Sequence, residues 1–322
     1  MTIRIKQQLK SWLHLAYGAS TFLPFVPNNL AWRGTGGTDS ARYCYSIWMR
    51  HLVKATSHGM VVPPRTVAEI GPGDSLGIGL AALLTGVSRY LALDVVQYAD
   101  MSRSAALVDE LVELIAQRVS IPDETEFPEI KPPLDSYNFP HALLSDSVLD
   151  TALDPRRVAS IKKCLLGAGC AESFVKYIVP WDSECVVERE SVDLLFSQAV
   201  MEHVDDLSKT YFSISEWLKP KGFCSHQIDF KSHDLTPSWD GYRAFSDFKW
   251  KMLRGKRPYL INREPCSTHS KLLVTNGLEL LETLQFSKPP ETSRKQLARR
   301  FAGLSETDRE ISGVFFVARK QI

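Results

Sequence analysis

The 322-residue chain has no excess of charge of either sign. Its 38 lysine and arginine residues stand against 37 aspartate and glutamate residues, which leaves a formal net charge of +1 at pH 7. A protein that binds nucleic acid usually carries a surplus of basic charge that attracts the phosphates. The balance therefore argues against DNA or RNA as a partner.

Paired cysteine motifs are also missing. The six cysteines include no C-x-x-C pair and no spacing typical of metal ligands. The sequence therefore predicts reduced thiols in a cytoplasmic protein, and it shows no metal site.

The amino terminus lacks an unbroken apolar run long enough to cross a membrane. Residues 1–38 contain a charge-free, aromatic-rich run over 11–32, and three basic residues precede it: Arg4, Lys6 and Lys10. Pro24 and Pro27 interrupt this run, so it cannot supply a span of about 20 residues. Two interpretations remain. The segment packs against the following domain, which we favour, or residues 3–32 rest on the inner face of a membrane.

The most informative stretch is a strand, a glycine turn and a helix in direct succession. Residues 66–70 have the pattern of a short buried strand, and 75–85 carry apolar residues at helical spacing. Between them, Gly71 and Gly73 allow unusual φ values and let a ligand approach the main chain. The free N–H groups of the following helix face that ligand.

Asp94 lies at the end of the next predicted strand, 91–95. A carboxylate at this position can accept hydrogen bonds from both hydroxyls of an adenosine ribose. The two stretches together therefore predict a nucleoside-binding βαβ unit.

Two cofactors fit such a unit. A dinucleotide usually requires G-x-G-x-x-G, whereas this chain has G-x-G-x-x-x-G. Glu69 lies two residues before the first glycine, and a carboxylate at this position would repel a diphosphate. S-adenosylmethionine has no phosphate, and its methionine end carries an ammonium group. Glu69-x-Gly71-x-Gly73 resembles motif I of the class I S-adenosylmethionine-dependent methyltransferases, of the methyltransferase-11-like, small-molecule type. Asp94 resembles the ribose-binding acid of that family.

Further segments carry the resemblance in the family's order. An acid near the third strand end binds the adenine amino group in the family, and Asp182 matches it by position. Glu202-His203-Val204 resembles a triplet that is frequent after the fourth strand, and Leu218-Lys-Pro-Lys-Gly222 resembles the L-K-P-G-G turn, with its second glycine displaced by Lys221. The resemblance implies S-adenosyl-L-methionine as the cofactor, bound by six residues: Glu69, Gly71, Gly73, Asp94, Asp182 and Ser197.

The resemblance also implies the fold. We expect an α/β, doubly wound, mostly parallel seven-stranded sheet with an antiparallel last strand, Rossmann-like, with the ligand at the carboxyl ends of the strands. The chain then divides into an N-terminal segment, 1–38, and a methyltransferase domain, 39–322. A helical insertion over about 100–170 follows the second strand and either caps a substrate cleft or decorates the surface. A polar and aromatic segment, 231–267, lies on the substrate side.

Methyl transfer to oxygen needs a group that accepts a proton, and histidine does so near neutral pH. His203 lies just beyond the fourth strand and is our first choice of general base, with His226 and His233 as alternatives. Whether Glu202 and His203 contribute to a metal site stays open, because no further ligand is visible in the sequence.

We expect methylation of an oxygen atom on a small molecule, a sugar or a lipid-linked acceptor. No Asn-Pro-Pro-Tyr or Asp-Pro-Pro-Tyr tetrapeptide follows the fourth strand, which argues against adenine and glutamine N-methylation. Tyr45, Trp239 and Arg263 are weaker substrate-binding choices. Two other functions remain open: a catalytically degenerate scaffold that keeps this fold, and, less favoured, an NAD(P)-binding oxidoreductase.

Overall fold

The computed structural model describes residues 12–26, 36–167, 174–181, 186–257 and 260–321. Within these residues, seven strands form one sheet in the order β3-β2-β1-β4-β5-β7-β6. The strands are β1 (Thr66–Ile70), β2 (Arg89–Leu93), β3 (Val175–Ile178), β4 (Val192–Gln198), β5 (Leu218–Asp229), β6 (Leu278–Ser287) and β7 (Ile311–Lys320). Neighbours from β3 to β5 are parallel, whereas β7 runs antiparallel to both β5 and β6. The predicted fold class is confirmed.

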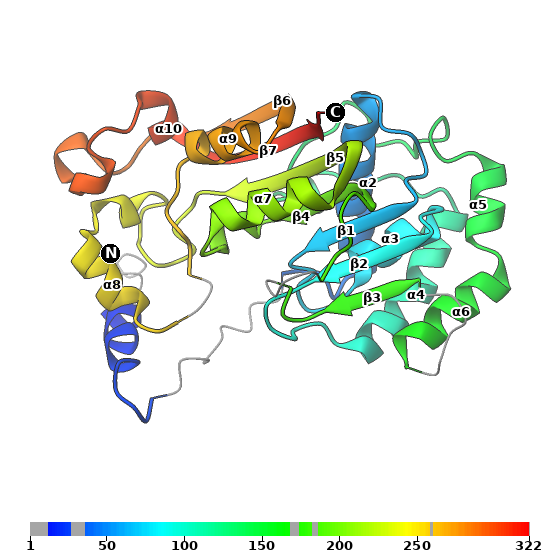
Figure 1. Ribbon diagram of the computed structural model, residues 1–322, viewed down its shortest axis with the longest axis horizontal. Coiled ribbons are helices and arrows are strands. Elements are labelled where there is room, and N and C mark those ends of the chain that lie inside the picture. Colours follow the sequence, from blue (N-terminus) through cyan, green and yellow to red (C-terminus); the bar gives the residue numbers. More distant parts are fainter. Residues whose placement is uncertain (1–11, 27–35, 168–173, 182–185, 258–259, 322) are drawn as a thin grey trace.

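Helices cover both faces of the sheet (Figure 1). One face packs against α2 (Ala41–Ser57), α3 (Gly77–Leu84) and α4 (Met101–Ala116), and the other against α7 (Leu207–Trp217) and α9 (Cys266–Thr275). Side chains alternate across a strand, so each strand contributes to both cores. In β1, Val67 faces the α2–α3 layer, and Ala68 and Ile70 face the α7–α9 layer.

Helix α2 begins directly after Ser40. Ser40 caps it by accepting a hydrogen bond from the Tyr43 N–H. The fifth strand, β5, starts at Leu218, so the turn predicted over 218–222 is a bulge within the strand. Leu218 pairs with Val192 and Phe223 with Leu194, and Lys221 takes a φ of 64° between them.

The predicted insertion is α4, a long loop, α5 (Asp146–Ala152) and α6 (Pro155–Leu165). Its proline-rich loop is tied to α2 by Arg50, which is completely buried and donates hydrogen bonds to the carbonyl oxygens of Pro122 and Pro132. Cys164 is disulfide-bonded, whereas Cys44, Cys224 and Cys266 are free. The expectation of reduced thiols is therefore wrong for Cys164, because sequence spacing does not reveal which sulfur atoms folding brings together.

The described part of the N-terminal segment packs on the domain beside α8 (Asp247–Arg254). Residues 12–20 are helical, and Gly18 lies so close to α8 that a Cβ there would overlap the Leu253 carbonyl oxygen. The Arg257 guanidinium lies over the Tyr17 ring, 5.3 Å from its centroid. Several apolar side chains remain exposed on this segment: Trp12, Leu13, Phe22, Leu23 and Phe25. Among the described residues, no helix is long and apolar enough to span a membrane.

Candidate functional site

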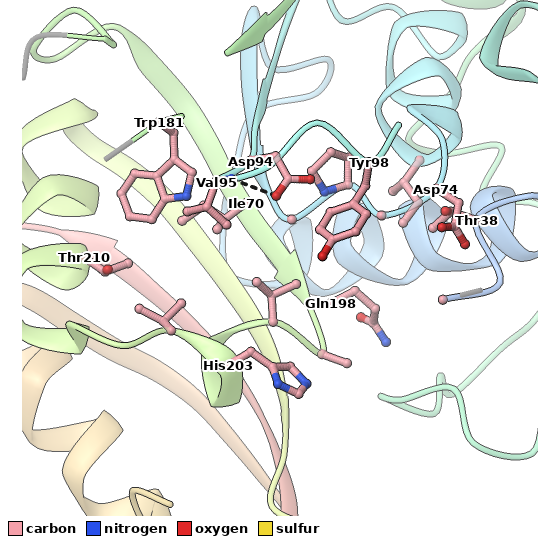
Figure 2. Close-up of a pocket in the computed structure, with 18 of the residues that line it drawn as sticks. Thr38, Ile70, Asp74, Asp94, Val95, Tyr98, Trp181, Gln198, His203 and Thr210 are labelled. Carbon is pink, nitrogen blue, oxygen red and sulfur yellow. Dashed lines mark hydrogen bonds between the residues drawn. The ribbon is translucent and has the colours of Figure 1, made fainter. Parts of the chain in front are cut away.

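A cavity of about 930 Å³ opens at the carboxyl ends of β1, β2 and β4. This is the position where open α/β sheets bind ligands, because the loops that follow neighbouring parallel strands diverge there. Figure 2 shows Asp94, Val95 and Trp181 on one side of the cavity, and His203 and Gln198 on the other.

The glycine turn forms the floor of the cavity. Gly71 and Gly73 have φ values of 71° and 78°, in the left-handed region that favours glycine. The Gly71 N–H donates to the Leu93 carbonyl oxygen over 2.9 Å, which fixes the turn to the end of β2. A Cβ on Gly71 would lie 2.6 Å from the Val200 side chain, so the close approach of the 198–204 loop requires glycine there.

Asp94 is the acid of the cavity wall beside the turn. Its Oδ1 accepts a hydrogen bond from the Val95 N–H over 2.8 Å, whereas among the described residues its Oδ2 has the Tyr177 hydroxyl at 3.5 Å as its hydrogen-bond donor. Burial raises the pKa of Asp94 to about 6, and the main-chain N–H groups of Val95 and Val96 offset this in part. Asp94 therefore presents a carboxylate with acceptor capacity left, between the apolar side chains of Val95 and Tyr98.

Glu69 does not line the cavity. It shares the α2–α3 face of β1 with Val67, and its Oε2 accepts a hydrogen bond from the Tyr90 hydroxyl over 2.5 Å. The Tyr90 ring occupies the space that a Cβ on Gly79 would need, so glycine at position 79 is a packing requirement. Burial raises the pKa of Glu69 to about 8. The motif acid thus braces the first βαβ unit from within the core.

Asp74 lines the cavity directly after the glycine turn. Its Oδ2 is buried and has no hydrogen-bond partner within the described part of the chain. Thr38 lies beside it, as Figure 2 shows, and its hydroxyl accepts a hydrogen bond from the Ser75 N–H over 3.2 Å. A buried acceptor without a partner, on a residue that lines the cavity, is suited to a ligand that donates hydrogen bonds.

His203 lies in the cavity wall opposite Asp94, in the 3-10 helix η1 (Met201–His203) that follows β4. The Asn262 side-chain amide holds η1 by donating to the carbonyl oxygens of Met201 and Val204. The centroid of the His203 ring lies 4.9 Å from that of the His233 ring. Two of the three histidines that the sequence selects therefore lie side by side, and one of them, His203, lines the cavity.

Glu202 is 2% exposed and does not line the cavity itself. Neither of its carboxylate oxygens has a hydrogen-bond partner among the described residues. Burial, with the Asp229 carboxylate second, raises the pKa of Glu202 well above its usual value, and the main-chain N–H groups of residues 202 and 229 offset this only in part.

His226 and Ser197 lie away from the cavity, which corrects our expectation for both. Ser197 Oγ and His226 Nδ1 are 2.8 Å apart inside the α7–α9 core. Burial lowers the pKa of His226 to about 3. Strand alternation explains the placement, because Ser197 and Leu195 share one face of β4 and that face is covered by α7.

The three weaker substrate choices also do not line the cavity. Tyr45 is buried and donates to the Val119 carbonyl oxygen, and the Trp239 indole N–H donates to the Pro289 carbonyl oxygen. Arg263 stacks on the Trp250 ring and donates to the Phe245 carbonyl oxygen. All three hold loops in place, so the expectation that they contact substrate is not supported. Asp182 lies outside the described residues.

Several wall residues escaped the sequence analysis: Thr38, Tyr43, Asp74, Tyr98, Trp181, Gln198 and Lys209. Asp74 and Trp181 had a signal in their positions directly after a strand-end turn. The others come from loops and helices whose approach to the cavity depends on folding. No described residue of the 100–170 insertion lines the cavity, which does not support the interpretation as a substrate cap.

Comparison with known proteins finds no matching family model and no matching curated protein. Solved structures with a similar chain arrangement include a SAM-dependent methyltransferase of Methanosarcina mazei, at 12% identity over 83% of this chain and 97% of that chain, with a TM-score of 0.44. Phosphoethanolamine N-methyltransferase 2 of Haemonchus contortus, in complex with S-adenosyl-L-methionine, is 15% identical over 88% of this chain and 57% of that chain, with a TM-score of 0.42.

Geranyl diphosphate C-methyltransferase of Streptomyces coelicolor A3(2), in complex with Mg2+, geranyl diphosphate and S-adenosyl-L-homocysteine, is 12% identical over 86% of this chain and 78% of that chain, with a TM-score of 0.42. These are similarities of chain arrangement at low identity. The ligand and the reaction of this chain must therefore be argued from its own residues.

Proposed function

We propose that the protein binds S-adenosyl-L-methionine in the 930 Å³ cavity and transfers its methyl group to an oxygen of a small-molecule, sugar or lipid-linked acceptor. The observation that carries this proposal is the pair of acids on one wall, Asp94 and Asp74. Each has acceptor capacity that the described chain does not use, and the glycine turn lies between them.

The two acids match the two ends of the ligand. Asp94 Oδ2 is free to accept from ribose hydroxyls, and Val95 and Tyr98 give the adjoining space apolar surfaces that suit a purine ring. Asp74 Oδ2 is suited to the ammonium of the methionine end, because a buried carboxylate oxygen gains most from a cationic donor. Asp74 thus takes the role that the sequence analysis gave to Glu69.

S-adenosylmethionine supplies the methyl group on a sulfonium, and the electron pair of the broken C–S bond stays on sulfur. The chain has to hold the acceptor oxygen in line and take away its proton. His203 is the histidine in the cavity wall, and it faces Asp94 across the cavity. We therefore propose that the acceptor binds on the His203 side.

Calorimetric titration with S-adenosylmethionine tests the proposal. Asp94→Ala removes the acceptor for the ribose hydroxyls, and loss of hydrogen bonds to a charged group costs about 1.5–3 kcal/mol, or roughly ten- to a hundredfold in affinity. Asp229→Ala is the control, because Asp229 is also an acid at the end of a strand but does not line the cavity.

Unchanged affinity in a folded Asp94→Ala protein contradicts the assignment of the ribose. No binding by the wild type contradicts the whole proposal. Binding without methyl transfer to any acceptor favours the scaffold interpretation instead.

A further inference from the structure

Loops at the carboxyl ends of β4 and β5 bring three metal-ligand side chains together: Glu202, His203 and His233. One ligand atom from each lies within 4.8 Å of the others. His233 Nε2 is 3.9 Å from Glu202 Oε1, too far for a hydrogen bond. Thirty residues separate His233 from His203, so only folding reveals the group.

Glu202 is the residue that demands an explanation. It is 2% exposed, and both carboxylate oxygens lack a hydrogen-bond partner in the part of the chain that is described. Neither protonation state removes the cost: an ionised carboxylate leaves its acceptors without a donor, and a protonated one leaves its O–H without an acceptor. Each such buried group costs about 1–3 kcal/mol. A bound cation satisfies the carboxylate directly.

The charge around Glu202 has the same sign as Glu202 itself. Among the charged groups around Glu202, the Asp229 carboxylate interacts with it most strongly. Lys231 is the cation of this region, and it is shared between Asp229 and Glu129, at 3.4 Å and 2.7 Å. A divalent ion at Glu202 would compensate the two carboxylates without moving Lys231.

We propose that Glu202, His203 and His233 bind a divalent first-row transition ion such as Zn2+ or Mn2+ beside the cavity. Two imidazoles and one carboxylate are typical ligands for such ions, whereas Mg2+ prefers oxygen alone. Ligand atoms about 2.0–2.2 Å from an ion stand roughly 3–3.5 Å apart. The group must therefore close by about 1 Å, and the His233 side chain, 34% exposed, has room to do so.

The ion's position gives it a role that rests on the proposed function. Three protein ligands leave coordination positions open, and His203 lies in the cavity wall, so an acceptor hydroxyl can reach the ion from the cavity. A hydroxyl bound there would lose its proton to solvent, its oxygen lone pair would form the bond to the methyl carbon, and the C–S pair would stay on sulfur. His203 then acts as a ligand and is not the proton acceptor that the sequence analysis suggested.

The test is a titration of the chelator-stripped, full-length protein with Mn2+, followed by paramagnetic resonance, and with Zn2+, followed by calorimetry. We expect one ion per chain. Glu202→Gln and His233→Gln should each weaken binding by about 100-fold or more, because each removes one of three ligands. His141→Gln is the matched control, since His141 is an exposed histidine outside the group. Glu202→Gln should also leave the metal-free protein at least as stable, because an amide at this buried position cannot ionise.

Absence of Mn2+ and Zn2+ binding by the folded wild type overturns the proposal, and so does binding that both ligand variants retain. If Glu202→Gln does not fold, His233→Gln and the wild-type titration still decide. S-adenosylmethionine calorimetry on the same samples separates the two proposals. Ion binding without cofactor binding keeps the metal site and contradicts the methyltransferase, and the reverse result restores His203 as the general base.

Discussion

Glu69→Gln is expected to change how the stability of the protein depends on pH. Glu69 is 1% exposed, and burial raises its pKa from 4.5 to about 8. Between these values the folded protein keeps a proton that the unfolded chain has released, so the free energy of unfolding falls as pH rises. Below pH 4.5 the penalty is absent, and above pH 8 it is complete.

The size of the effect follows from the pKa difference. One pKa unit corresponds to 1.36 kcal/mol, so ionising Glu69 in the core costs on the order of 5 kcal/mol in full. This is a large share of the 5–15 kcal/mol that stabilises a typical domain. Glutamine has the shape of the protonated acid and can still accept from the Tyr90 hydroxyl, but it cannot ionise.

Urea unfolding of both proteins at pH 5, 7 and 9 measures the effect. The difference between variant and wild type should grow in favour of Glu69→Gln by several kcal/mol from pH 5 to pH 9. Other titrating groups cancel in this difference, and Glu110→Gln, an exposed change on α4, should show no such growth. Parallel stability curves for Glu69→Gln and the wild type would refute the account of Glu69 as a buried brace.

Three further results are expected. Gly71→Val should abolish S-adenosylmethionine binding, because the new side chain would overlap Val200 and residue 71 has a φ of 71°. Gly303→Val, with open space around it, should bind normally, and binding by Gly71→Val would show that the turn tolerates a side chain. Affinity for S-adenosylmethionine should fall as pH drops through about 6, because ribose hydroxyls need Asp94 ionised, and a flat calorimetric profile from pH 5 to 8 would contradict this. The full chain should sediment with anionic vesicles more than a variant with serine in place of the exposed Trp12, Leu13 and Phe25. Equal sedimentation of the two proteins would eliminate membrane contact through these side chains.

The sequence by itself determined the order of strands and helices and the position of the cavity. These features depend on local signals: apolar runs for strands, periodicity for helices, a serine cap at Ser40, and glycines at the turn. Parallel strands bring their carboxyl ends to one edge, so Gly71, Gly73 and Asp94 could be grouped before the fold was known.

Only the tertiary structure decided which way the strand side chains point. Alternation puts Glu69 on the same face of β1 as Val67, and Ser197 on the same face of β4 as Leu195. It does not say which helical layer covers each face. Once α2 and α3 cover the first and α7 the second, Glu69 and Ser197 belong to cores and Asp74 remains in the cavity wall.

The three-residue group at Glu202 was equally beyond the sequence. His226 and His233 were equivalent alternatives along the chain. The structure separates them because His226 lies within β5 and faces the core, whereas His233 follows the strand and turns back toward His203. Local patterns specify elements and their ends, but contacts between loops thirty residues apart depend on how the whole sheet packs.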